Sequence, residues 1–167
     1  MSSLERGDRS PDIALRDETG TLHRLSEQRD IWTIVFFYPK DDTPGCTVES
    51  CQFRDLNPEI HDAGAQVWGI SPDGSASHAR FRAKFNLPFT LLSDEDHAVS
   101  EAYGAWRLRT LYGVEFMGIQ RSTFLVDPDG TIARSWPKVK ADGHAAEVLA
   151  ALDEARAARA VTRHANP

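Results

Sequence analysis

Short apolar runs alternate along this chain with segments in which apolar residues recur at helical spacing. Residues 31–38 (IWTIVFFY) are β-branched or aromatic almost throughout, which is typical of a central strand buried on both faces. Residues 66–70 (QVWGI) predict a second short strand, ended by the turn sequence SPDG at 71–74. Residues 122–126 and 131–136 flank an Asp-Pro-Asp-Gly turn, so we expect them to pair as an antiparallel hairpin.

Three further segments predict helices. Residues 75–85 carry apolar side chains among charges, residues 96–103 are a shorter candidate, and residues 144–160 place their apolar side chains on one stripe. Nearer the N-terminus, residues 12–25 contain Glu-Thr-Gly between apolar residues and predict a small hairpin. Strands and helices in this order indicate an α/β fold with a mixed central sheet flanked by helices. The pattern leaves the order of the strands in that sheet open.

The length and the ends of the chain indicate a single domain. The 167 residues suffice for one domain with a substantial core, whereas two packed domains would each be small. We expect this domain to span residues 1–167, with residues 1–8 and 161–167 as loose tails. The first ten residues are charged and lack the apolar stretch of a secretory signal. Since the longest apolar run is only as long as a strand, the sequence predicts a cytoplasmic protein without a membrane anchor.

The charge balance argues against a nucleic-acid partner. The formal net charge is -6, whereas binding to phosphates needs a clustered basic surface. Three arginines gather near the C-terminus, at positions 156, 159 and 163. They are spaced among alanines and acids, which is typical of a solvated helix end.

The candidate chemistry follows the central strand directly. The strand runs into Pro-Lys-Asp-Asp-Thr-Pro-Gly-Cys at 39–46, and loops at the carboxyl ends of strands are where α/β proteins usually build their sites. Thr43 is a good N-cap and Pro44 fits the first helical position, so Cys46 should lie in the first turn of a helix. Free N–H groups and the helix dipole would favour its thiolate, the nucleophilic form. The plainer interpretation is a small buried hydrophobic residue.

The only other cysteine is Cys51, five positions further on. In an intact helix the Cα atoms of residues i and i+5 lie roughly 8 to 9 Å apart, whereas a disulfide needs them within roughly 7 Å. Either the two cysteines never pair, or the helix unwinds locally when they do. Such a rearrangement suits a disulfide that is made and broken in each catalytic cycle better than a permanent one.

Other cysteine chemistries fit less well. A metal site usually shows C-x-x-C pairs or histidines at ligand spacing, and a thioredoxin-type oxidoreductase needs C-x-x-C. No phosphate-binding glycine loop or dinucleotide fingerprint is present. A Cys–His hydrolase stays open, since its partners can be distant in sequence. The histidines are scattered, and we expect each to be a surface or capping residue: His23, His61, His78, His97, His144 and His164.

Taken together, these residues resemble a known family. The pattern Pro39-x-x-x-Thr43-x-x-Cys46 is similar to the active-site motif of peroxiredoxins, which are cysteine peroxidases with a thioredoxin-like fold. The fuller string FFYPKDDTPGCTVESCQFRD resembles the branch called bacterioferritin comigratory protein, or Q-type peroxiredoxin. Residues 117–127 resemble the segment around that branch's arginine, and residues 112–113 and 136–140 also match. The resemblance covers roughly residues 8 to 155.

The resemblance implies a role for each matched residue. Cys46 would attack the peroxide as a thiolate and become a sulfenic acid. Thr43 would offer its hydroxyl to the thiolate and to the peroxide, and Arg121 would stabilise the thiolate and the developing negative charge. Pro39 would wall the pocket, and the backbone N–H groups of Gly45 and Cys46 would complete the peroxide site. On their own, Thr43, Arg121 and Pro39 could equally be a helix cap, an edge-strand charge and a strand terminator.

The resemblance also assigns a partner to Cys46. Cys51 would resolve the sulfenic acid as an intramolecular disulfide, which thioredoxin or a similar dithiol would then reduce. No metal and no organic cofactor is implied, because the cysteine itself carries the electrons. The branch is often monomeric, so we expect a monomer or a weak dimer. Two alternatives stay open: a redox switch or sensor that uses the Cys46–Cys51 disulfide, and a thioredoxin-fold scaffold with unreactive thiols.

Overall fold

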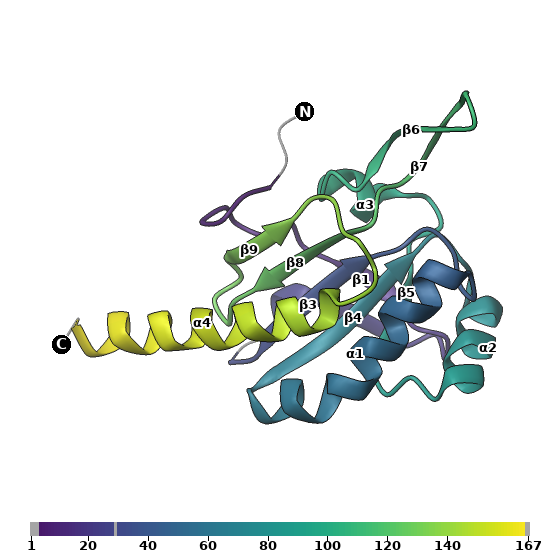
Figure 1. The fold of residues 1–167 in the computed structure, drawn as a ribbon. Coiled ribbons are helices and arrows are strands. Elements are labelled where there is room, and N and C mark those ends of the chain that lie inside the picture. Colours follow the sequence, from purple (N-terminus) through teal and green to yellow (C-terminus); the bar gives the residue numbers. More distant parts are fainter. Residues whose placement is uncertain (1–3, 29, 166–167) are drawn as a thin grey trace.

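The computed structural model describes residues 4–28 and 30–165. Its elements follow one another along the chain as drawn in Figure 1: β1 (Ala14–Arg16), β2 (Leu22–Arg24), the 3-10 helix η1 (Leu25–Glu27), β3 (Trp32–Phe37), α1 (Pro44–Asp62), β4 (Ala65–Ser71), α2 (Ser75–Phe85), β5 (Thr90–Ser93), α3 (Ala98–Ala102), β6 (Trp106–Leu111), β7 (Val114–Ile119), β8 (Ser122–Val126), β9 (Ile132–Trp136) and α4 (His144–Ala165).

A seven-stranded mixed sheet forms the centre of the molecule, with the order β2-β1-β5-β4-β3-β8-β9. Strand β4 pairs in parallel with both β3 and β5, whereas β8 pairs antiparallel to β3 and β9 antiparallel to β8. All six residues of β3 are buried, as expected for a strand that has neighbours on both edges and cover on both faces. The expected central strand at β3, the expected hairpin at β8–β9 and the mixed sheet are confirmed.

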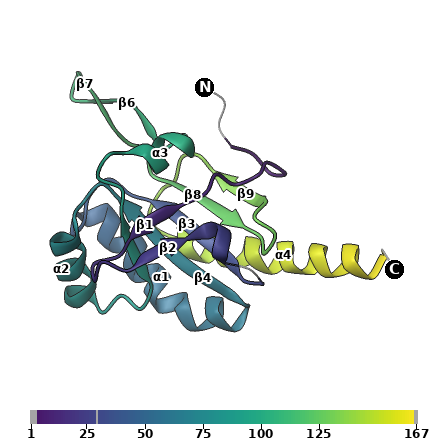
Figure 2. The same cartoon turned by 180° about the vertical axis from the view of Figure 1, so that it is seen from behind.

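Helices cover one face of this sheet. A core cluster joins Ile34 and Phe36 of β3 to Phe53 of α1, Phe81 of α2 and Val148 of α4, and Figure 1 shows α1 and α4 in front of the sheet. The opposite face is covered by α3 and the N-terminal segment, as Figure 2 shows from behind. There a second cluster joins buried residues of the sheet to buried residues of the segments that cover it: Ile13, Val35, Phe37, Trp68 and Tyr103.

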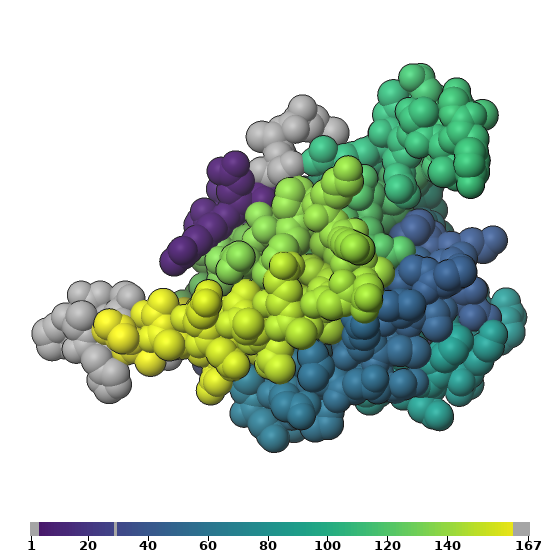
Figure 3. Space-filling view, viewed as in Figure 1, coloured from purple at the N-terminus to yellow at the C-terminus, as the bar shows by residue number. Residues whose placement is uncertain are grey.

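Most of the expected elements are present at close to the expected positions. The N-terminal hairpin is β1–β2, the helix at 75–85 is α2, and the shorter helix candidate is α3. Strand β5 and the hairpin β6–β7 were not expected. This second hairpin forms a separate two-stranded sheet and projects from the body of the molecule in Figure 3.

Some described residues within the expected loose tails, 1–8 and 161–167, form backbone hydrogen bonds or helix. Gly7 donates a backbone hydrogen bond to Ile132 of β9, and the backbone N–H of Ile132 donates to Asp8, because the edge strand β9 offers unpaired backbone groups. At the other end, α4 continues to Ala165 through an alanine-rich stretch with high helix propensity. Residues 1–3 and 166–167 lie outside the described residues. None of the described helices is long and apolar enough to cross a membrane.

Candidate active site

The site begins where the central strand passes into the first long helix. Thr43 has extended backbone angles and α1 starts at Pro44, so the expected N-cap and first helical residue are at their expected positions. The backbone N–H of Thr47 donates to the Thr43 carbonyl over 2.8 Å. The Thr43 hydroxyl makes no side-chain cap; it donates to the Lys40 carbonyl oxygen over 2.8 Å instead. The Thr43 side chain therefore stabilises the loop before α1 and does not cap the helix.

Cys46 lies in the first turn of α1, fully buried and with a free thiol. Nη2 of Arg121 donates to its Sγ over 3.2 Å, across 75 positions of sequence. The sheet explains this contact, because Arg121 directly precedes β8 and the first residue of β8, Ser122, pairs with Phe37 at the end of β3. A cationic donor beside the sulfur favours the thiolate over the thiol. Burial would lower the pKa of Arg121, but Glu49 and Cys46 raise it above its usual value, so the guanidinium stays charged.

Glu49 was not among the expected site residues. It follows Cys46 by three positions on α1 and therefore lies on the same side of the helix. Nη1 of Arg121 donates to Glu49 Oε1 over 2.7 Å, and the Glu49 side chain is fully buried. Burial raises the pKa of Glu49 to about 7, against the lowering effect of Arg121. Its second oxygen, Oε2, is buried without a hydrogen-bond partner among the described residues. The one guanidinium therefore donates to both the Cys46 sulfur and a single oxygen of the Glu49 carboxyl group.

Of the other expected residues, Gly45 lies beside Arg121. A Cβ atom on Gly45 would come within 3.0 Å of Arg121 Nη2, so Gly45, Cys46 and Arg121 are brought together. Pro39 is partly buried just beyond the end of β3. No hydrogen bond joins Thr43 to Cys46 in the part of the chain that the structure describes, and the expected contact of that hydroxyl with the sulfur is not made in this state.

Cys51 lies on the same helix, partly buried and with a free thiol. Since α1 runs unbroken from Pro44 to Asp62, helix geometry keeps the two cysteines too far apart for a disulfide. The two thiols therefore do not pair in this conformation.

Burial of the histidines differs from expectation. His78 is fully buried on α2, and His144 is 4% exposed at the start of α4. His144 lies with Nε2 2.8 Å from Thr123 Oγ1 and Nδ1 3.2 Å from Glu147 Oε1. Burial lowers the pKa of His144. The expectation of surface or capping positions is wrong for His78, because its polar partners are supplied by distant segments.

No group of three or more His, Cys, Asp or Glu among the described residues could hold a metal ion.

Comparison with known proteins reveals clear relatives of this chain. The model of the AhpC/TSA family matches residues 6–135. Peroxiredoxin Bcp of Bacillus subtilis is 42% identical over 152 residues, which are 91% of this chain and 97% of the relative. The solved structure of Xanthomonas campestris peroxiredoxin Q is 43% identical, with a TM-score of 0.81 over 85% of this chain and 90% of that one. A structure of the Xanthomonas campestris bacterioferritin comigratory protein, studied for its alkyl peroxide reduction activity, is 41% identical, with a TM-score of 0.83 over 92% and 98%.

Proposed function

Because this chain belongs to the AhpC/TSA family of peroxiredoxins, we propose that Cys46 is its peroxidatic cysteine and that Cys51 is its resolving cysteine. The protein is a thiol peroxidase of the Bcp or Q type with a thioredoxin-like fold. Proteins of this kind act on peroxides with the help of a reductant, and a role as a redox switch alone is not favoured by these relatives. The roles of individual residues are the content of the proposal.

One observation carries the assignment of Cys46: the 3.2 Å hydrogen bond from Arg121 Nη2 to its Sγ in the first turn of a helix. The thiolate would attack one peroxide oxygen, forming an S–O bond while the O–O bond breaks. The sulfur is oxidised to a sulfenic acid and the peroxide is reduced to an alcohol or water, whose oxygen takes up a proton. Arg121 stabilises the negative charge that passes from sulfur to the leaving oxygen.

The neighbouring residues would bind the peroxide. The Thr43 hydroxyl, which now donates to the Lys40 carbonyl, would turn its proton to the thiolate or to a bound peroxide oxygen. The N–H groups of Gly45 and Cys46 lie among the free donors of the helix start and would bind the second oxygen. Pro39 would exclude water on the strand side.

Resolution by Cys51 requires a change in α1. The Cys51 thiolate would attack the sulfenic sulfur and expel water, giving an intramolecular disulfide. Since an intact helix keeps the two Cα atoms roughly 8 to 9 Å apart, the first turns must unwind. An external dithiol would then reduce the disulfide, and we propose thioredoxin as that dithiol. A monomeric state and a cytoplasmic location stay predictions.

Intact mass after one equivalent of hydrogen peroxide tests both assignments. The wild type should lose two hydrogens, Cys51→Ser should gain one oxygen atom on Cys46, and Cys46→Ser should keep its mass. With thioredoxin and its reductase, only the wild type should turn over repeatedly. Oxygen on Cys51 rather than Cys46, or repeated turnover by Cys51→Ser with thioredoxin, would contradict the respective role.

A further inference from the structure

A second buried ion pair lies beside the active-site loop and takes no part in the mechanism above. His78 of α2 is fully buried. Its Nδ1 lies 2.6 Å from Asp41 Oδ2, and its Nε2 lies 3.0 Å from the carbonyl oxygen of Leu92 on β5. A carboxylate and a carbonyl both only accept hydrogen bonds. With Asp41 ionised, both ring nitrogens donate, so the geometry points to an imidazolium at His78.

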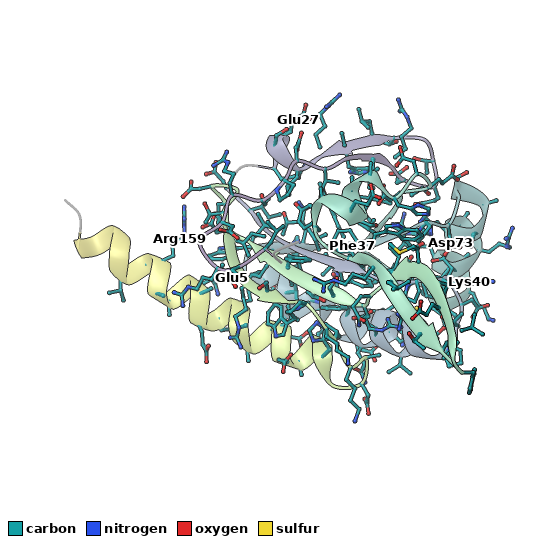
Figure 4. All side chains as sticks on the ribbon, turned by 90° about the horizontal axis from the view of Figure 1, so that it is seen from above. Glu5, Glu27, Phe37, Lys40, Asp73 and Arg159 are labelled. Atoms are coloured by element: carbon teal, nitrogen blue, oxygen red, sulfur yellow. The ribbon has the colours of Figure 1, made fainter. Side chains whose placement is uncertain are left out.

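Asp41 is held from several further directions. Its Oδ1 accepts the Tyr38 hydroxyl over 2.6 Å, and its Oδ2 also accepts the Ser77 hydroxyl over 2.8 Å. The backbone N–H of Asp41 donates to Asp73 Oδ2 over 2.7 Å. Figure 4 shows the neighbouring labelled residues, Lys40 and Asp73, at the same end of the molecule, opposite to Arg159. The carboxylate of Asp41 thus ties the loop after β3 to α2, and its backbone N–H ties the same loop to the turn after β4.

The tied loop is the one that delivers the active-site residues. Asp41 precedes Thr43 by two positions, and the Thr43 hydroxyl closes the loop onto Lys40. The Thr43 carbonyl then accepts the first hydrogen bond of α1. Displacing Asp41 would therefore shift Thr43 and the first turn of α1, while Arg121 stays fixed by β8 on the other side of the sulfur.

We propose that His78 is a positioning residue for the peroxidase reaction, which holds Asp41 so that Thr43, Gly45 and Cys46 stay aligned with Arg121. The inference rests on the proposed role of Cys46. It predicts that loss of the imidazolium slows the first chemical step, since small misplacements of reacting groups are costly to rate.

The same helix provides a matched control. Lys84 of α2 pairs with Asp42 of the same loop over 2.7 Å, but both side chains are exposed, at 58% and 44%. Exposed pairs contribute little, whereas removing one partner of a buried pair leaves an uncompensated charge. Breaking Lys84–Asp42 should therefore leave the loop in place, and breaking His78–Asp41 should not.

The protonation of His78 responds to the groups that face it. Burial alone would lower the pKa of His78, but the hydrogen bond and charge of Asp41 raise it above its usual value, together with the Leu92 carbonyl and the charge of Asp73. The Tyr38 ring, directly after β3, faces it from the sheet side. On its own helix, the nearest cation in the next turn, Arg82, is paired with Glu18. Asp41, the Leu92 carbonyl and Asp73 therefore all favour the imidazolium form of His78.

The test combines single-turnover oxidation by hydrogen peroxide with the ultraviolet absorbance of the Cys46 thiolate. His78→Gln keeps a hydrogen-bond donor without the charge, and it should slow oxidation by about tenfold or more and reduce the thiolate absorbance. Lys84→Ala should stay within about twofold of the wild type. Phe85→Leu, which weakens packing on the same helix, should lower stability without changing the rate, and so separates positioning from general destabilisation.

Two measurements keep the inference testable if His78→Gln does not fold. Ser77→Ala removes one donor to Asp41 and should slow oxidation by about threefold, in the same direction. In the wild type, nitrogen NMR of His78 should show hydrogen on both ring nitrogens at neutral pH. A neutral His78, or a folded His78→Gln with unchanged rate and thiolate absorbance, would overturn the inference. If instead the wild type fails to react at Cys46, the proposed function itself is wrong.

Discussion

The guanidinium of Arg121 lies against Gly45 on the side where any other residue would carry its Cβ atom. A Cβ atom on Gly45 would lie 3.0 Å from Arg121 Nη2, tighter than most such contacts. The same nitrogen donates to Cys46 Sγ, so the absence of one methyl group at Gly45 lets the cation reach the sulfur.

The first prediction follows from this contact. Gly45→Ala should push the guanidinium away from the sulfur and slow single-turnover oxidation by about tenfold, because charge stabilisation depends on exact donor placement. Thr47→Ala, in the same turn of α1, should leave the rate nearly unchanged. Equal rates for Gly45→Ala and the wild type would mean that the guanidinium can move aside without consequence.

Arg121→Lys keeps the positive charge but should still slow the reaction with peroxide strongly. The guanidinium donates to Cys46 with one nitrogen and to Glu49 with the other, and a single ammonium group cannot reproduce this fork. We expect the rate constant for hydrogen peroxide to fall about 100-fold, the usual effect of losing one oxyanion donor. Arg134→Lys, at an exposed and loosely paired arginine, is the control. A loss of less than about threefold at Arg121 would show that charge alone suffices.

Glu49 should make the stability of the protein fall as the pH rises. Its pKa is raised from 4.5 to about 7 by burial. Between these values the unfolded chain has released the proton while the folded chain keeps it, so folding becomes less favourable with increasing pH. The difference corresponds to about 3 kcal/mol, present as a penalty above neutral pH and absent below about pH 4.5.

Glu49→Gln, which cannot ionise, should remove this slope. Urea denaturation at about pH 5 and about pH 8 would measure it as the difference in unfolding free energy between variant and wild type. Glu154→Gln, at an exposed glutamate, should retain the wild-type slope. His78, with its raised pKa, adds to the slope in the same direction. A slope in Glu49→Gln as steep as in the wild type would therefore assign the titration to another group.

Oxidation should remove part of α1. If Cys46 and Cys51 pair, residues 44–51 must leave the helix, while Phe53 and Ile60 stay fixed in the core. We expect a decrease in far-ultraviolet helical circular dichroism and faster amide hydrogen exchange confined to residues 44–51. Cys51→Ser treated with the same peroxide should show neither change. A disulfide formed with full retention of helical signal would disprove the unwinding.

Local pattern was enough for the elements whose side chains are buried in a regular order. Strand β3 is buried at every position and α2 matches its expected range. Strand β5 has only two buried residues, too few to distinguish a strand from a loop. The hairpin β6–β7 and its turn are largely exposed and show no burial pattern, with these large apolar side chains at the surface: Leu108, Leu111, Tyr112, Val114, Phe116 and Met117.

The residue pattern predicted the local part of the candidate site, the family resemblance added the distant Arg121, and neither predicted Glu49 or the burial of His78. Thr43, Gly45 and Cys46 lie in one short stretch whose turn and helix signals are visible in the sequence. Glu49 and His78 are charged or polar residues that are exposed by default. Their burial depends on Arg121, 72 positions from Glu49, and on Asp41, 37 positions from His78.

Because the Cys46 side chain is completely buried, the size of a reagent should decide how fast it reaches the sulfur. Hydrogen peroxide is small and should need only a slight opening around the sulfur, whereas a bulky maleimide should react only after the first turns of α1 open. The ratio of the two labelling rates therefore reports how often the closed protein opens, independently of how nucleophilic the sulfur is. Cys51 is only partly buried on the same helix, so its maleimide labelling rate provides the internal reference for this ratio.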